Sequence, residues 1–139
     1  MKAFYFSAAL AGLFLLTGCD QDKFESTSAG KGGAAALRIS LNHKGTVLQN
    51  GVVRIRYNAT VPPVSAAGWD DSADVIQLPS TAGEAIFPSL RPGNYYIYGT
   101  AYLPNSTFKE PKIVSGGFAY TLNENKAVNI ALPLDKVEE

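Results

Sequence analysis

Alternation of apolar and polar residues is the feature that most constrains the fold of this chain. Leu37, Ile39 and Leu41 are separated by polar residues, and the same two-residue period recurs several times downstream. This period gathers the apolar side chains on one face of an extended strand, whereas a helix would need a period of 3.6 residues. The strand candidates are residues 37–41, 53–57, 75–78, 85–87, 95–103, 113–122 (interrupted at Gly116-Gly117) and 128–132.

Turn-forming residues separate these candidates. The dipeptides Asn50-Gly51, Pro62-Pro63 and Pro92-Gly93 supply the fixed φ of proline, the conformational freedom of glycine, or both, as tight turns require. Short strands with frequent turns, and no helical apolar stripe among them, are typical of an antiparallel sandwich. We therefore expect an all-β domain, a single antiparallel seven-stranded sandwich over residues 36–135, followed by a charged tail at 136–139.

A short apolar run precedes the strands and ends at Cys19, which is the single cysteine of the chain. Lys2 followed by the apolar residues 8–16 is typical of a secretory signal peptide, and the run is too short for a helix that spans a bilayer. The string Leu16-Thr17-Gly18-Cys19 resembles the lipobox of bacterial lipoproteins. That resemblance implies cleavage after residue 18 and acylation of Cys19, for example with palmitate. The alternative is a free structural cysteine.

Cleavage after residue 18 would leave 121 residues, enough for one domain with a hydrophobic core. Residues 19–35 are rich in glycine and serine, which predicts a flexible tether between the lipid and the domain. We therefore expect a lipid-anchored protein of the cell envelope, in the outer membrane of a Gram-negative bacterium. Asp20 and Asp22 resemble the sorting signals of some lipoproteins, which in some bacterial groups direct the protein to the outer leaflet of the outer membrane and in others retain it in the inner membrane. They are equally well explained as solvated charges, so the choice between inner and outer membrane and the leaflet stay open.

Charge and residue content argue against several function classes. Twelve basic and twelve acidic residues balance, and no run of Lys or Arg marks a groove for nucleic acid, so we expect no nucleic-acid partner. His43 is the only histidine and lies at the end of a predicted strand, where a solvated side chain is expected. The acylated Cys19 would leave no catalytic thiol. No arrangement of nucleophile, base or metal ligands is visible, so we expect neither an enzyme nor a cofactor.

Three segments carry a resemblance to a known group of modules. Residues 83–97, with Phe87, Leu90 and Pro92-Gly93, resemble the signature of carboxypeptidase-regulatory-like and collagen-adhesin B-type modules. Residues 45–55 resemble the opening of those modules, and 126–132 resemble their closing strand. The resemblance implies a transthyretin-like, or prealbumin-like, β-sandwich. Because such modules are mostly adapters, it also implies a non-catalytic binding role.

A row of tyrosines is the strongest candidate for a binding surface. If Tyr95 and Ile97 face the core, the tyrosines at alternate positions face outward. The resemblance implies that strand 52–58 lies beside 95–102, which brings two arginines next to this row. Rigid aromatic rings with guanidinium groups suit a glycan or an envelope protein partner, although tyrosine also packs well on any exposed sheet. The candidate surface comprises Tyr96, Tyr98, Tyr102, Arg54 and Arg56.

The loop before residue 75 offers two weaker site candidates. Asp70, Asp71 and Asp74 could supply oxygen ligands to calcium, but their spacing does not match the calcium-loop pattern, and acidic loops are common. The tripeptide Asp71-Ser72-Ala73 resembles an O-glycosylation acceptor of exported proteins in some Gram-negative anaerobes, which makes Ser72 the acceptor. Two functions are carried forward: a binding or adapter module, and a structural accessory subunit of a surface assembly such as a pilus.

Overall fold

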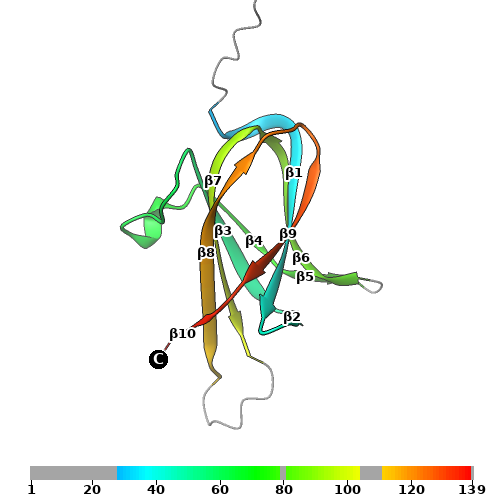
Figure 1. Ribbon diagram of the computed structural model, residues 1–139, viewed down its shortest axis with the longest axis vertical. Coiled ribbons are helices and arrows are strands. Elements are labelled where there is room, and N and C mark those ends of the chain that lie inside the picture. The colour runs from blue at the N-terminus through cyan, green and yellow to red at the C-terminus, as the bar shows by residue number, and fades with distance from the viewer. Residues whose placement is uncertain (1–27, 79–80, 104–110, 139) are drawn as a thin grey trace, which may run out of the picture.

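A computed structural model describes residues 28–78, 81–103 and 111–138, and it places them in two β-sheets that pack face to face (Figure 1). Most of these residues lie in strands, and the only helix among them is one turn of 3-10 helix. None of the described segments is a helix of the length and apolarity that a membrane span needs. The expectation of an all-β protein is confirmed. Cys19 and the apolar run before it lie outside the described residues, so the signal peptide and the acylation stay predictions.

The strands divide between the two sheets in a simple order. In chain order the elements are β1 (Gly30–His43), β2 (Thr46–Leu48), β3 (Gly51–Tyr57), η1 (Ala66–Gly68), β4 (Asp71–Asp74), β5 (Ile76–Leu78), β6 (Thr81–Arg91), β7 (Gly93–Tyr102), β8 (Ile113–Leu122), β9 (Ala127–Pro133) and β10 (Lys136–Glu138). The first sheet has the order β2-β1-β6-β5, with β9 also paired to β1, and the second has the order β10-β8-β7-β3-β4. The β1–β9 pair is parallel, and every other pair is antiparallel.

The prediction of seven antiparallel strands is wrong in number and, for one pair, in direction. The described residues form ten strands, and β9 runs parallel to β1. The three strands that the sequence pattern missed are β2, β4 and β10, each three or four residues long. Segments this short cannot display a two-residue period, so their extended form depends on pairing with a longer neighbour.

The hydrophobic core lies between the two sheets and contains the alternating apolar residues. Leu37, Ile39 and Leu41 of β1 are fully buried. Across the sandwich, Ile55 of β3 and Ile97 of β7 are also fully buried and pair directly with each other. Burial of one such side chain contributes about 1.5–3 kcal/mol to folding, which explains why these faces point inward. The opposite faces of β3 and β7 must then point to solvent.

The domain begins earlier than predicted, because part of the expected tether at residues 19–35 belongs to β1. The Asn58 side-chain oxygen accepts a hydrogen bond from the backbone N–H of Ala29 at 2.8 Å, and the Tyr95 hydroxyl accepts one from Gly30 at 2.9 Å. A glycine-rich segment buries too little surface to order itself. Hydrogen bonds from the folded domain therefore order it, and the expectation of a flexible tether is wrong from Ala29 onward.

The C-terminal segment is also more ordered than predicted. Residues 136–138 of the expected tail at 136–139 form β10, which pairs with the edge of β8. Just before it, Leu134 is fully buried, and its N–H donates to the carbonyl of Asn42 at 2.7 Å. After Leu134 the chain crosses to the second sheet (Figure 1), where β10 pairs with β8 and becomes the edge strand.

Strand β8 runs without a break through Gly116 and Gly117, where the sequence pattern predicted an interruption. The two glycines serve opposite faces of the sheet. A side chain at Gly116 would collide with the backbone of Pro133, so glycine lets the end of β9 approach closely. A Cβ at Gly117 would lie 3.0 Å from the ring of Tyr98 on the outer face. The glycine pair is therefore explained by close packing and not by a turn.

Candidate binding surface

The outer face of the second sheet brings together four of the predicted surface residues. Strands β3 and β7 are adjacent, and their register sets Arg54 opposite Tyr98 and Arg56 opposite Tyr96. All four side chains are partly exposed, on the face away from the core. Tyr102 faces the same side at the end of β7 and is 51% exposed, but it makes no ring contact with another described aromatic residue.

Trp69 is the functional candidate that sequence reasoning missed. Its ring lies 5.5 Å from that of Tyr98, measured between centroids, with an angle of 22° between the planes. The ring of Tyr96 lies 6.3 Å away, at 30°. We call Trp69, Tyr96 and Tyr98 the aromatic cluster. Trp69 is thus stacked on Tyr98 and tilted toward Tyr96, which concentrates aromatic surface where the sequence suggested only a row of separate tyrosines.

The loop that carries Trp69 is held to β3 by backbone contacts. Directly after the tryptophan, the N–H of Asp70 donates to the carbonyl of Ile55 at 3.0 Å, and the Asp70 carboxylate accepts from the N–H of Tyr57 at 2.7 Å. On the other side of the loop, Arg56 donates to the carbonyl of Pro62 at 3.5 Å. These contacts place the indole over the sheet. A lone tryptophan in a loop without periodicity carried no signal that could have located it.

No described residue neutralises the charge of the two arginines of the surface. Among the described residues neither Arg54 nor Arg56 forms an ion pair, and the hydrogen bond of Arg56 goes to a neutral carbonyl. The hydroxyl of Tyr98 donates to the carboxylate of Glu138 at 3.1 Å, which ties β10 to the aromatic cluster. The surface therefore combines aromatic rings with positive charge.

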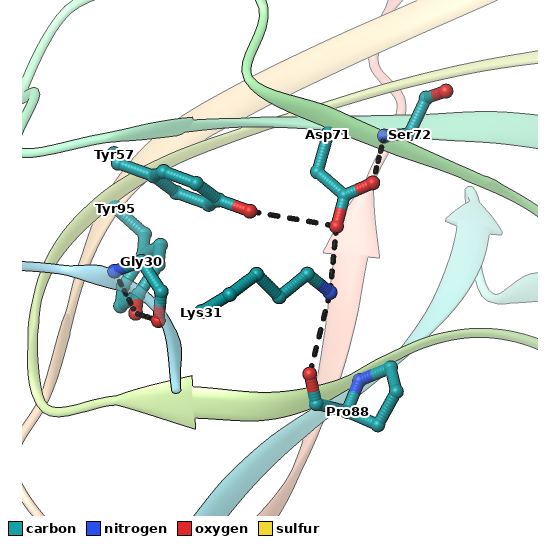
Figure 2. A network of polar contacts seen from close by, with 7 residues as sticks. All are labelled: Gly30, Lys31, Tyr57, Asp71, Ser72, Pro88 and Tyr95. Carbon is teal, nitrogen blue, oxygen red and sulfur yellow. Dashed lines mark hydrogen bonds and ion pairs between the residues drawn. The ribbon is translucent and has the colours of Figure 1, made fainter. Parts of the chain in front are cut away.

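Asp71 has a structural role that links the two sheets, as Figure 2 shows. Its carboxylate forms an ion pair with the Lys31 ammonium at 2.8 Å. It also accepts a hydrogen bond from the Ser72 N–H at 2.9 Å and a longer one from the Tyr57 hydroxyl at 3.5 Å. The same ammonium donates to the carbonyl of Pro88 at 3.3 Å. Lys31 thus connects β1 and β6 of the first sheet to β4 of the second.

The phenol of Tyr57 is held in its neutral form by this surrounding. Burial raises the pKa of Tyr57 to about 12, and the negative charges of Asp71 and Asp70 add to the increase. Because the hydroxyl keeps its proton at neutral pH, it can act as the donor to Asp71. The Asp71 carboxylate in Figure 2 is therefore bound within the protein by Lys31, Tyr57 and the backbone of Ser72.

The structure does not group Asp70, Asp71 and Asp74 as the calcium candidate would require. Asp70 binds the backbone of β3, and Asp71 pairs with Lys31. Within the described part of the chain, no group of three or more His, Cys, Asp or Glu side chains could hold a metal ion. Loop residues that are close in sequence are thus directed to different partners.

Ser72 and His43 have contrasting positions. Ser72 is exposed on β4, which forms one edge of the second sheet, and it lies opposite Arg54. O-glycosylation of Ser72 stays a prediction. His43 is not the solvated loop residue that was expected: it is partly buried, and its Nδ1 lies 2.5 Å from the carbonyl oxygen of Leu134. Its contact supports the turn into the C-terminal segment.

Comparison with known proteins gives a distant structural likeness. No family model matches the chain, and no curated protein matches it. Among solved structures, it is similar to the crystal structure of a candidate carbohydrate-binding protein from Pseudomonas aeruginosa. The identity is 14%, the TM-score is 0.47, and the match covers 76% of this chain and 91% of the other. A likeness this distant says nothing about the ligand of this protein.

Proposed function

We propose that this protein is a lipid-anchored, non-catalytic binding or adapter module of the cell envelope, with a transthyretin-like β-sandwich that binds a glycan. The observation that carries this proposal is the stacking of Trp69 on Tyr98, with the ring of Tyr96 beside it, outside the hydrophobic core. Aromatic rings offer large apolar faces with polar edges, which match the apolar faces and the hydroxyl rim of a sugar ring. Tyrosine, tryptophan and arginine are also the residues that dominate binding energy at interfaces.

The surface is well prepared for binding before a ligand arrives. Tyr96 and Tyr98 are fixed by β7, in the interior of the sheet, and the loop of Trp69 is anchored to β3 through Asp70. Ordering flexible side chains on binding costs about 0.5–1.5 kcal/mol for each one. A cluster that is already ordered avoids much of this cost. We therefore infer that the stacked rings serve ligand binding in addition to stabilising the sheet.

A glycan array and titration calorimetry test the proposal. We expect the wild-type protein to bind at least one glycan, and Trp69→Ala to weaken that binding about 30-fold or more, the loss typical of a hot-spot residue. The double variant Tyr96→Ala/Tyr98→Ala should behave in the same way, with a melting curve close to that of the wild type.

Tyr102→Ala is the matched control, because Tyr102 is exposed on the same face but lies outside the aromatic cluster. It should bind within a few-fold of the wild type. If Trp69→Ala and Tyr102→Ala retain equal affinity, the aromatic cluster is packing only. If the wild type binds no glycan, the proposal fails.

The envelope location in this proposal rests on Cys19 and the short apolar run before it. Replacing Cys19 with alanine removes the atom that would be acylated and should move the protein from the membrane to the soluble fraction. The check is fractionation of cells followed by a high-salt wash, with Ser28→Ala as the control substitution. Sedimentation of Cys19→Ala with membranes after the wash would contradict the lipid anchor.

A second candidate function is a structural accessory subunit of a pilus-like surface assembly. The loop that leads to Trp69 favours it, because the apolar side chains of Val61 and Val64 are exposed there. Exposed apolar side chains on a loop can form contacts between subunits. Self-association in sedimentation velocity experiments, together with a blank glycan array, would place this function first.

A further inference from the structure

The two arginines beside the aromatic cluster have positions that constrain the chemistry of the ligand. Arg54 lies between Tyr98 on β7 and Ser72 on β4, directly opposite each of them in the register of the sheet. Arg56 lies opposite Tyr96. Residues that are directly opposite in neighbouring strands have side chains on the same face, with Cβ atoms about 4.5–5.5 Å apart. Both guanidinium groups therefore share the outer face with the rings.

Two of the three acidic residues near Arg54 are bound to other groups, and the third forms no ion pair with it. The carboxylate of Asp70 binds the N–H of Tyr57, and the carboxylate of Asp71 binds Lys31. Asp74 lies one step further along β4 on the same face, opposite Val52, and forms no ion pair with a described residue. Arg54 makes no hydrogen bond or ion pair within the described part of the chain.

Arg54 differs from Arg38 of the first sheet, which has a carboxylate partner within the protein. Arg38, on the outer face of the first sheet, has the carboxylate of Glu84 at 3.9 Å. A partly buried cation loses hydration, and this loss is offset only when an anion or hydrogen-bond acceptor is supplied. For Arg54, the described residues supply neither. A ligand that stacks on the aromatic cluster could supply the acceptor.

We propose that the surface recognises a glycan that carries carboxylate groups, a uronic acid oligosaccharide, with Arg54 as the carboxylate-binding residue. This inference rests on the proposed glycan-binding function. The planar guanidinium presents two parallel N–H donors that match the two oxygens of a carboxylate. One sugar ring stacked on the aromatic cluster would hold its carboxylate near Arg54, and the exposed hydroxyl of Ser72 offers a neutral hydrogen-bonding group beside it.

Single-stranded nucleic acid also binds to arginine and aromatic side chains, but the charge of this protein does not favour it. Nucleic-acid grooves track the backbone with an extended positive surface. Here basic and acidic residues are equal in number, and Glu138 lies at the hydroxyl of Tyr98. Two local arginines suit one or two carboxylates and not a polyphosphate chain.

Paired probes test this inference: a set of hexuronate oligosaccharides and their carboxyl-reduced counterparts, which keep the linkages and replace each carboxylate with a hydroxymethyl group. Titration calorimetry of the wild-type protein should show about 10- to 100-fold tighter binding of a uronate than of its reduced counterpart, the range for hydrogen bonds to a charged group. Arg54→Gln should lose this preference, so that the uronate binds no more tightly than its reduced counterpart.

Arg38→Gln is the matched control, because it removes the same charge from the other sheet and should keep the full preference. The inference is overturned if the wild type binds both members of each pair equally, if it binds no uronate, or if Arg54→Gln keeps the preference. It is also overturned if a single-stranded oligonucleotide competes as well as the best uronate. Binding of neutral glycans that depends on Trp69 would still support the proposed function in each of these cases.

Discussion

Replacing Tyr95 with alanine is expected to lower the free energy of unfolding by about 3–5 kcal/mol, as for other large aromatic side chains in cores. Tyr95 has no exposed surface, and its ring packs edge-on against that of Tyr57 with 5.7 Å between centroids. Its hydroxyl donates to the carbonyl of Arg91 at 2.6 Å and accepts from the N–H of Gly30 at 2.9 Å. The substitution removes a core side chain and the contact that holds the start of β1.

Urea denaturation of three variants separates these contributions. Tyr95→Phe keeps the ring but leaves the N–H of Gly30 without its acceptor, which should cost about 1–3 kcal/mol. Tyr96→Ala, next in the chain but on the outer face, should cost no more than about 1 kcal/mol. Equal losses for Tyr95→Ala and Tyr96→Ala would contradict the inward and outward assignment of β7.

Replacing Gly116 with valine is expected to destabilise the fold by about 3 kcal/mol, at the upper end of the range for overpacked cores. A Cβ at this position would overlap the carbonyl oxygen of Pro133 and lie 3.2 Å from the Cα of Leu134. Both of these are backbone atoms, which cannot rotate away as the end of a side chain can. The sheets would have to separate where β8 approaches the end of β9, and the burial of Leu134 would be lost.

The matched control for this prediction is Ala119→Val on the same strand. Ala119 lies on the outer face opposite Tyr96 and is exposed, so added methyl groups there meet solvent and should change stability by less than about 0.5 kcal/mol. Thermal and urea denaturation compare the two variants. A Gly116→Val protein as stable as Ala119→Val would show that β9 does not need this close approach.

The contrast between the two glycines also bears on the candidate binding surface. Gly116 permits contact between the sheets, whereas Gly117 leaves room on the outer face for Tyr96 and Tyr98, the two rings of β7 on which Trp69 stacks. The same strand therefore supports both the core and the aromatic cluster. A side chain at Gly117 would displace the rings, so the glycine is part of the shape of the surface.

Where strands are long, the sequence by itself determined which side chains face inward. The alternation in β7 placed Tyr95 in the core and Tyr96 and Tyr98 on the outer face, and the structure agrees. The pairing of β3 with β7 was expected from the resemblance of the chain to known modules. The physical basis is local: a strand of ten residues with a strict period has only one register that buries its apolar face.

The remaining features depended on contacts between residues far apart in the chain, and only the tertiary structure decided them. Trp69 reaches the tyrosines because backbone hydrogen bonds hold its loop against β3. Residues 29–35 become ordered because Asn58 and Tyr95 bind the N–H groups of Ala29 and Gly30 and because the start of β1 pairs with β6, although their composition predicts a flexible chain. Arg54 forms no ion pair with a described residue, since Asp70 and Asp71 are bound elsewhere and Asp74 lies opposite Val52, one position further along the sheet. Loops and short edge strands carry no periodicity, so their placement follows from the partners that the folded sheets present.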